Sequence, residues 1–134
     1  MVVIDGVVYL GSPYSHKDKK VRDKRARDIS KVAARLMGMG YCIYCPIAET
    51  VMIAKYGQIK STSWEFWKTQ DLPKLAMCKE LWVCTMPGWK KSKGVGGEME
   101  FALMNYIPIY LLNPNTLKVT PYSDYIKSMN EVKE

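Results

Sequence analysis

The residues of this chain best suited to chemistry lie in residues 86–102, where a glycine-rich segment precedes an acid. Gly94, Gly96 and Gly97 come directly before Glu98. Glycines let the backbone approach a ligand, free amides at a helix start can hold a phosphate, and a carboxylate beside a bound sugar can act as a nucleophile. Glu98 is therefore a candidate catalytic residue. An acid at a helix start also suits the helix dipole without any function, and that alternative remains open.

The elements around Glu98 place it at a favourable position for ligand binding. The apolar run 81–85 predicts a strand, and residues 97–105 predict a helix. In an open α/β sheet, ligands bind where a strand ends and the next helix begins. The glycine pattern matches neither G-x-G-x-x-G nor the Walker A sequence, so the evidence for a site must come from the rest of the chain.

Strands and helices alternate along the whole chain. We expect strands at 2–4, 7–11, 41–45, 81–85 and 107–112, and helices at 18–39, 47–56, 64–78, 97–105 and from 121 or 122 to 132. Asp5-Gly6 favours a hairpin after the first run, Ser63 can cap the third helix, and Pro73 should kink or restart that helix. This order predicts an α/β, Rossmann-like (flavodoxin-like) three-layer sandwich with a roughly five-stranded parallel sheet, to which residues 2–4 could add an edge strand.

The composition describes one globular domain. The chain has 134 residues, of which 48% are hydrophobic and 25% charged, which suits a single well-buried core. No apolar run approaches the roughly 20 residues that span a bilayer, and the first residues lack a signal peptide pattern. We therefore expect a cytoplasmic protein that does not bind membranes.

The cysteines do not predict a metal site. Cys42 and Cys45 have C-x-x-C spacing, but no second pair exists and His16 is the sole histidine. All four cysteines, including Cys78 and Cys84, lie in apolar segments, so we expect buried free thiols, no metal and no cofactor.

The net charge of +7 is concentrated in residues 17–28. There, bases alternate with acids and continue into an apolar stripe at helical spacing, which is typical of the solvated face of an amphipathic helix. Attraction of an anionic substrate or a polynucleotide are the alternatives, and Arg22 and Arg25 could reach a phosphate. No zinc-finger or aromatic RNA-binding pattern supports nucleic acid.

Three segments together resemble the nucleoside 2-deoxyribosyltransferase superfamily. They are Tyr-Leu-Gly-Ser-Pro-Tyr-Ser-His at 9–16, Trp-Glu-Phe-Trp at 64–67 with Asp71, and the Pro-Gly-Trp to Glu segment at 87–98. The resemblance extends to about Leu112 and is greatest to a small bacterial and phage branch. Residues 92–98 are also similar to the Ser-x-Gly-Val-Gly-x-Glu of 2'-deoxynucleoside 5'-monophosphate N-glycosidases.

The resemblance implies a role for each matching residue. Glu98 would be the nucleophile that attacks the anomeric carbon, Asp71 would contact the nucleoside and could help protonate the leaving base, and Ser92 would hold the 5'-phosphate. The turn after the first strand would help form the sugar and phosphate pocket, with Gly11, Ser12, Pro13 and Tyr14. Two positions depart from the family, Gly97 in place of an aromatic residue and Glu100 as a second acid, and both leave base specificity open.

Further side chains carry paired interpretations. Tyr14 could hydrogen-bond Glu98 or the phosphate, or could simply pack. His16 could contact substrate or remain an exposed loop residue, and Glu100 could be a second acid or face solvent. Four aromatic residues could stack on a base: Trp64, Phe66, Trp67 and Trp89. The first three, at helical spacing, suit a core better, whereas the loop residue Trp89 suits a pocket.

The resulting expectation is cleavage of the N-glycosidic bond of a (deoxy)nucleoside 5'-monophosphate through a covalent intermediate on Glu98. A nucleoside 2-deoxyribosyltransferase would use the same residues, and Ser92 with the basic surface favours the hydrolase. A nucleotide-binding domain without catalysis, or an interaction protein that uses the basic helix, are the remaining alternatives. The resemblance also implies a homodimer or larger homo-oligomer.

Overall fold

The computed structural model describes residues 6–133, with side chains described through residue 130. Its strands form one sheet in the order β2-β1-β3-β4-β5. They are β1 (Val8–Gly11), β2 (Ile43–Tyr44), β3 (Glu80–Cys84), β4 (Ile109–Leu112) and β5 (Val119–Pro121). The first four run parallel, and β5 is antiparallel to β4. This is the flavodoxin-like strand order, in which the chain reverses direction across the sheet between β1 and β3.

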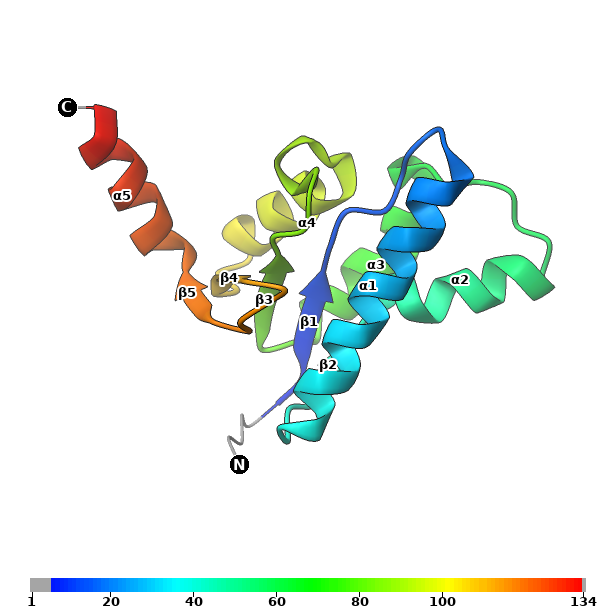
Figure 1. The fold of residues 1–134 in the computed structure, drawn as a ribbon, viewed down its shortest axis with the longest axis horizontal. Coiled ribbons are helices and arrows are strands. Elements are labelled where there is room, and N and C mark those ends of the chain that lie inside the picture. The colour runs from blue at the N-terminus through cyan, green and yellow to red at the C-terminus, as the bar shows by residue number, and fades with distance from the viewer. Residues whose placement is uncertain (1–5, 134) are drawn as a thin grey trace.

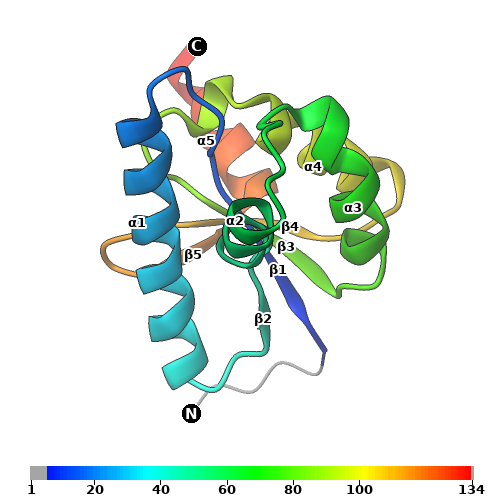
Figure 2. The same cartoon turned by 90° about the vertical axis from the view of Figure 1, so that its right-hand side faces the viewer.

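Helices cover both faces of this sheet (Figure 1). They are α1 (Lys19–Gly38), α2 (Pro46–Tyr56), α3 (Trp64–Ala76), α4 (Lys93–Met104) and α5 (Tyr122–Lys133), with a short 3-10 helix η1 (Trp89–Lys91) before α4. Figure 2 shows α1 on one side of the sheet, α3 and α4 on the other, and α2 between them. The predicted Rossmann-like three-layer fold is confirmed.

Side chains of β1 alternate between two hydrophobic cores, as the period of a strand requires. Val8 and Leu10 pack against α1, whereas Tyr9 packs on the side of α3 and α4. The α1 side contributes Ile29, Val32, Ala33 and Leu36, and the opposite side contributes Leu75, Val95 and Ala102. Tyr9 and Gly11, two residues apart, therefore both face the helices that carry the candidate acids.

Side-chain caps fix the starts of α1 and α3. Asp18 accepts a hydrogen bond from the amide of Lys20 at 2.9 Å, and Ser63 accepts one from Phe66 at 3.3 Å. The predicted helix at 18–39 and the Ser63 cap are confirmed. Pro73 does not divide α3, which continues from Trp64 to Ala76, so the predicted restart there is wrong. The proline removes the hydrogen bond to the carbonyl of Thr69, and the rest of the helix forms in spite of that loss.

The predicted start of α4 is wrong. Ser92 caps this helix by accepting from the amide of Val95 at 3.2 Å, so α4 begins at Lys93. The segment expected to be a glycine-rich loop is therefore the first turns of a helix, and Glu98 lies in the second turn. The cap and the packing of α4 outweigh the low helix propensity of three glycines.

The sheet also differs from the prediction at its edges. Val119–Pro121 forms β5, which makes the sheet mixed rather than wholly parallel. A three-residue strand that ends in proline gives little signal, and proline is tolerated because this strand is at an edge. The predicted strand at 2–4 and its hairpin lie outside the described residues.

The prediction of buried cysteines holds for Cys45 and Cys84, whereas Cys42 is exposed and Cys78 half-buried. All four are free thiols. Cys42 precedes the two-residue strand β2 at the sheet edge, where neighbours cover only one side of the chain. Within the described residues, no helix is long and apolar enough to cross a membrane.

Candidate active site

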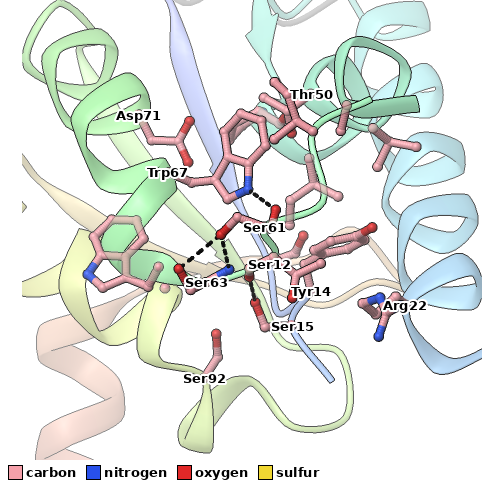
Figure 3. A pocket seen from close by; sticks show the side chains of 18 of the residues that line it. Ser12, Tyr14, Ser15, Arg22, Thr50, Ser61, Ser63, Trp67, Asp71 and Ser92 are labelled. Carbon is pink, nitrogen blue, oxygen red and sulfur yellow. Dashed lines mark hydrogen bonds between the residues drawn. The ribbon is translucent and has the colours of Figure 1, made fainter. Parts of the chain in front are cut away.

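A pocket of about 600 Å³ lies beyond the carboxyl ends of β1 and β2 and extends to the start of α4. In folds with this strand order, ligands bind outside the carboxyl ends of the strands, near the point where the order reverses. Six of the predicted site residues line it: Ser12, Tyr14, Asp71, Ser92, Gly94 and Glu98. Figure 3 shows Ser12 and Tyr14 from the β1 loop, Asp71 from α3 and Ser92 at the start of α4 around the same space.

Glu98 is buried at the base of this pocket, with 5% of its surface exposed. The hydroxyl of Tyr9 donates a hydrogen bond to Oε2 of Glu98. On the other side, a Cβ atom at Gly11 would lie 3.0 Å from Oε1, so glycine leaves the space that the carboxyl group occupies. Gly11 thus leaves room for the Glu98 carboxyl group and does not line the pocket.

Tyr9 is a site residue that sequence reasoning missed. It reads as an ordinary apolar residue of a buried strand, and its side chain is fully buried. A usable signal was its spacing, since Tyr9 lies two residues before Gly11 and shares its face of the sheet. The hydrogen bond from Tyr9 to Glu98 forms because of the way α4 packs on the sheet, and residue spacing does not predict that packing.

Asp71 and Ser12 offer polar atoms without protein partners. Asp71 is 9% exposed and Ser12 is 5% exposed, yet Oδ1 of Asp71 and Oγ of Ser12 accept or donate no hydrogen bond within the described residues. Buried polar atoms are rarely left without partners unless water or a ligand satisfies them. Both atoms are therefore available to a molecule bound in the pocket.

Burial raises the pKa values of Asp71 and Glu98 by different amounts. It raises the pKa of Glu98 to about 8, the Tyr9 hydrogen bond opposes that rise, and the charge of Asp71 adds to it. The pKa of Asp71 rises to about 6 because of burial, and the Lys74 ammonium opposes the rise. Near neutral pH, Asp71 is thus mostly ionised and Glu98 mostly protonated, and such a separation of pKa values is typical of acid and base pairs in active sites.

Gly97 allows α3 and α4, the helices that carry these acids, to pack closely. A Cβ atom at Gly97 would lie 2.6 Å from three atoms of the Trp64 indole, so only glycine permits this approach of α3 and α4. Gly97 does not line the pocket. Its neighbour Gly96 is exposed, and a Cβ atom added there would meet no other atom within 4 Å.

Ser92 lies where it could serve both helix and ligand. Its Oγ accepts from Val95, which leaves the hydroxyl hydrogen free to donate into the pocket. Gly94 also lines the pocket, at the start of α4. Amides of a first helical turn favour anions, which suits the predicted phosphate position.

The two arginines of α1 have different positions. Arg22 lines the pocket and donates to the carbonyl of His16. Arg25 lies outside it and donates to the carbonyls of Tyr14 at 3.3 Å and Ser15 at 2.9 Å. A Cβ atom at Gly88, which has a φ of 93°, would lie 2.6 Å from the Arg25 guanidinium, so Arg25 also meets the loop after β3.

Several predicted residues lie elsewhere. Trp89 packs edge-on against Tyr125 of α5, with ring centroids 6.0 Å apart, and does not line the pocket. Pro13 is fully buried, and Glu100 is exposed and outside the pocket. His16 is exposed, and its Nδ1 accepts from the amide of Asp18 at 3.0 Å, which supports the start of α1.

The wall formed by α2 and the following segment was not predicted. It includes Ile47, Thr50, Val51, Lys55, Ile59 and Lys60. Nothing in the spacing of this helix distinguishes it from an ordinary packed helix, so its place over the carboxyl end of the sheet comes from the fold.

The comparisons with known proteins place the chain in a family without assigning an activity. Among the described residues, no cluster of three His, Cys, Asp or Glu side chains is placed to hold a metal ion. No curated protein matches the chain. Residues 6–114, which include both acids and the pocket, match the family described as a domain of unknown function (DUF1937), and the chain belongs to that family.

Proposed function

We propose that this protein hydrolyses the N-glycosidic bond of a nucleoside 5'-monophosphate to free base and sugar phosphate. The observation that carries the proposal is the convergence of two buried carboxyl groups, from α3 and α4, on one pocket, with a tyrosine hydroxyl donated to one of them. Two carboxyl groups with different acidities are the usual equipment for glycosidic bond cleavage. The resemblance to the deoxyribosyltransferase superfamily supports the same chemistry.

In the proposed reaction, the Glu98 carboxylate attacks the anomeric carbon of the sugar. The bond from that carbon to the base breaks, and its electron pair leaves with the base, which takes up a proton. Water then attacks the same carbon and releases a proton, which balances the one taken up by the base, and the carboxylate leaves. Tyr9 would hold Glu98 in place and stabilise its ionised form.

Asp71 and Ser12 would bind the sugar or the base through their free polar atoms. Ser92 and the first-turn amides of α4 would hold the 5'-phosphate. Tyr14 lines the same pocket, where its ring or hydroxyl would contact the ligand. The reaction needs no cofactor.

The test is a chromatographic screen for base released from nucleosides and nucleotides, with and without an added acceptor base. We expect release from at least one monophosphate, loss of release in Glu98→Gln, and little change in Glu100→Gln. Glu100 is a matched control because it lies on the same helix but is exposed and outside the pocket. Mass spectrometry of acid-quenched protein should detect a sugar phosphate attached to Glu98.

Other outcomes assign other functions. Release that requires an acceptor base identifies a deoxyribosyltransferase, which would use the same carboxyl groups. Tight binding of a nucleotide with no release from any substrate identifies a nucleotide-binding domain and overturns the proposal.

A further inference from the structure

The pocket has two chemically different halves. Asp71 and Glu98 lie in the half formed by α3 and α4, together with the indoles of Trp64 and Trp67. The other half, formed by α1, α2 and the segment after α2, carries the basic side chains Lys19, Arg22, Lys55 and Lys60. Figure 3 shows Asp71 and Arg22 on opposite sides of the pocket, with Trp67 and Tyr14 between them.

The basic half carries an excess of positive charge. Asp23 is the acid that lines this half, and it pairs with Lys19 at 2.7 Å. Within the described part of the chain, Arg22, Lys55 and Lys60 form no ion pair with an acid. Arg22 uses a guanidinium N–H for the carbonyl of His16, and its remaining donors are free for a ligand. Three cations of one sign along a concave wall attract and hold anions.

Between these cations the wall is apolar. It is formed by Ile47, Val51, Ala54 and Ile59. A surface of this kind binds a flat or apolar group, while adjacent cations bind the phosphates attached to it. The half distant from the acids therefore suits more of a ligand than a sugar and a single phosphate.

We propose that the basic half binds phosphate groups that continue beyond the 5'-phosphate, so that the ligand contains a pyrophosphate linkage. Nucleoside diphosphates, nucleoside triphosphates and pyrophosphate-bridged dinucleotides share this chemistry. The inference rests on the proposed function for the position of the nucleoside beside Asp71 and Glu98. In Figure 3, Ser15 lies between Ser92 and Arg22, and its hydroxyl donates to the carbonyl of Thr62, so a phosphate chain that starts at Ser92 would pass this residue to reach the cations.

Calorimetric titration of the Glu98→Gln protein tests this without turnover. The ligands are the matched pairs dAMP and dADP, dGMP and dGDP, dCMP and dCDP, dTMP and dTDP, and the dinucleotide NAD⁺. For at least one pair, or for NAD⁺ against the monophosphates, we expect at least about tenfold tighter binding of the pyrophosphate compound, since each added charge-assisted hydrogen bond has about that value.

Two variants and one control locate the effect. Arg22→Ala with Lys60→Ala, and Lys55→Ala with Lys60→Ala, should remove the gain and lower monophosphate affinity by a much smaller factor. The second variant disturbs no hydrogen bond of the described structure, so it remains informative if loss of Arg22 affects folding. Arg27→Ala with Lys31→Ala is the matched control, because both residues are exposed on α1 and lie outside the pocket.

The outcomes separate this inference from the proposed function. Equal affinity for both members of every pair and no tighter binding of NAD⁺, a gain that survives both variants, or no binding of any compound overturns the inference. Base release from a monophosphate would in those cases still support the proposed function. A pyrophosphate gain that the variants remove, in a protein that releases no base, supports the binding site and overturns the catalytic role.

Discussion

The hydroxyl of Tyr9, on the central strand β1, donates its hydrogen bond to Oε2 of Glu98, on α4. Both groups are buried, and the pKa of Tyr9 lies far above its usual range because of burial and the nearby acids. Tyr9 therefore stays protonated and remains a donor throughout the ordinary pH range. Its hydrogen bond is the described contact that favours the ionised form of Glu98, which a nucleophile requires.

Tyr9→Phe should move the pH dependence of base release to higher pH. The donor that stabilises the Glu98 carboxylate is lost, so its pKa should rise by about one unit and activity at neutral pH should fall about tenfold. A profile of kcat/KM against pH for both proteins measures this. Tyr44→Phe is the control, because the Tyr44 ring lies 5.5 Å from that of Tyr9 and its hydroxyl makes no hydrogen bond to Glu98.

The same profile decides the role of Glu98. As a nucleophile it must lose its proton, so activity should increase as pH rises through about 8. If Glu98 donates a proton to the leaving base, activity should instead decrease through that pH. A fall in activity near pH 8 that moves to a different pH in Tyr9→Phe would contradict the covalent mechanism.

Stability should decrease as pH rises from about 4.5 to about 8. The pKa of Glu98 is 4.5 when the side chain is solvated, as in the unfolded chain, and about 8 in the folded chain. Between these pH values, the folded chain keeps a proton that the unfolded chain has lost. The stabilising contribution is complete below the lower value and lost above the upper one, with a slope of up to about 1.4 kcal/mol per pH unit.

Urea unfolding at several pH values checks this expectation. Glu98→Gln should remove the slope above about pH 6, where the pKa of Asp71 lies in the fold, and leave a smaller slope below it. An unchanged slope above that pH in the variant would show that Glu98 is not the group responsible.

Gly97→Ala should destabilise the fold by about 1–3 kcal/mol, because the new methyl group would overlap the Trp64 indole and force α3 and α4 apart. Activity should decrease as well, since these helices carry Asp71 and Glu98. Gly96→Ala is the control in the same helix turn, where a methyl group meets open space and should stabilise the helix by about 0.4–1 kcal/mol. Thermal unfolding and base release measure the two effects.

Ser92 should show separable roles in folding and in phosphate binding. Ser92→Ala removes the cap of α4 and should cost about 1 kcal/mol of stability. Ser92→Asp keeps a capping oxygen, yet places a negative charge beside the proposed phosphate, so KM for a monophosphate should rise while stability is retained. Equal KM values for the Asp variant and the unmodified protein would move the phosphate away from Ser92.

Element order was predictable because it depends on local patterns. The helical spacing from Asp18, the Ser63 cap and the apolar run before Thr85 each act over a few residues. Prediction failed at the start of α4, where three glycines with low helix propensity are helical. The Ser92 cap is as local as that of Ser63 and could have been predicted, whereas the packing of Trp64 on Gly97 joins distant parts of the chain.

The site could be predicted only in part for the same reason. Glu98 is conspicuous as an acid directly after glycines, whereas Asp71 lies in the second half of α3 and is identified through the resemblance. Tyr9 and the α2 wall are not identifiable in either way, because a strand tyrosine and an ordinary helix acquire a role only when the fold brings them to one crevice. Trp89 illustrates the converse, since a loop aromatic expected in the pocket packs on Tyr125 instead.

Arg25 has a consequence for how the pocket could be altered. Its guanidinium binds the carbonyls of Tyr14 and Ser15 and lies against Gly88, so a single α1 side chain braces the loops after β1 and β3. The two loops at this edge of the pocket are therefore coupled, and a change in the conformation of one would alter the position of the other. Redesign of ligand preference is better directed at α2, which lines the pocket and contributes no residue to this brace.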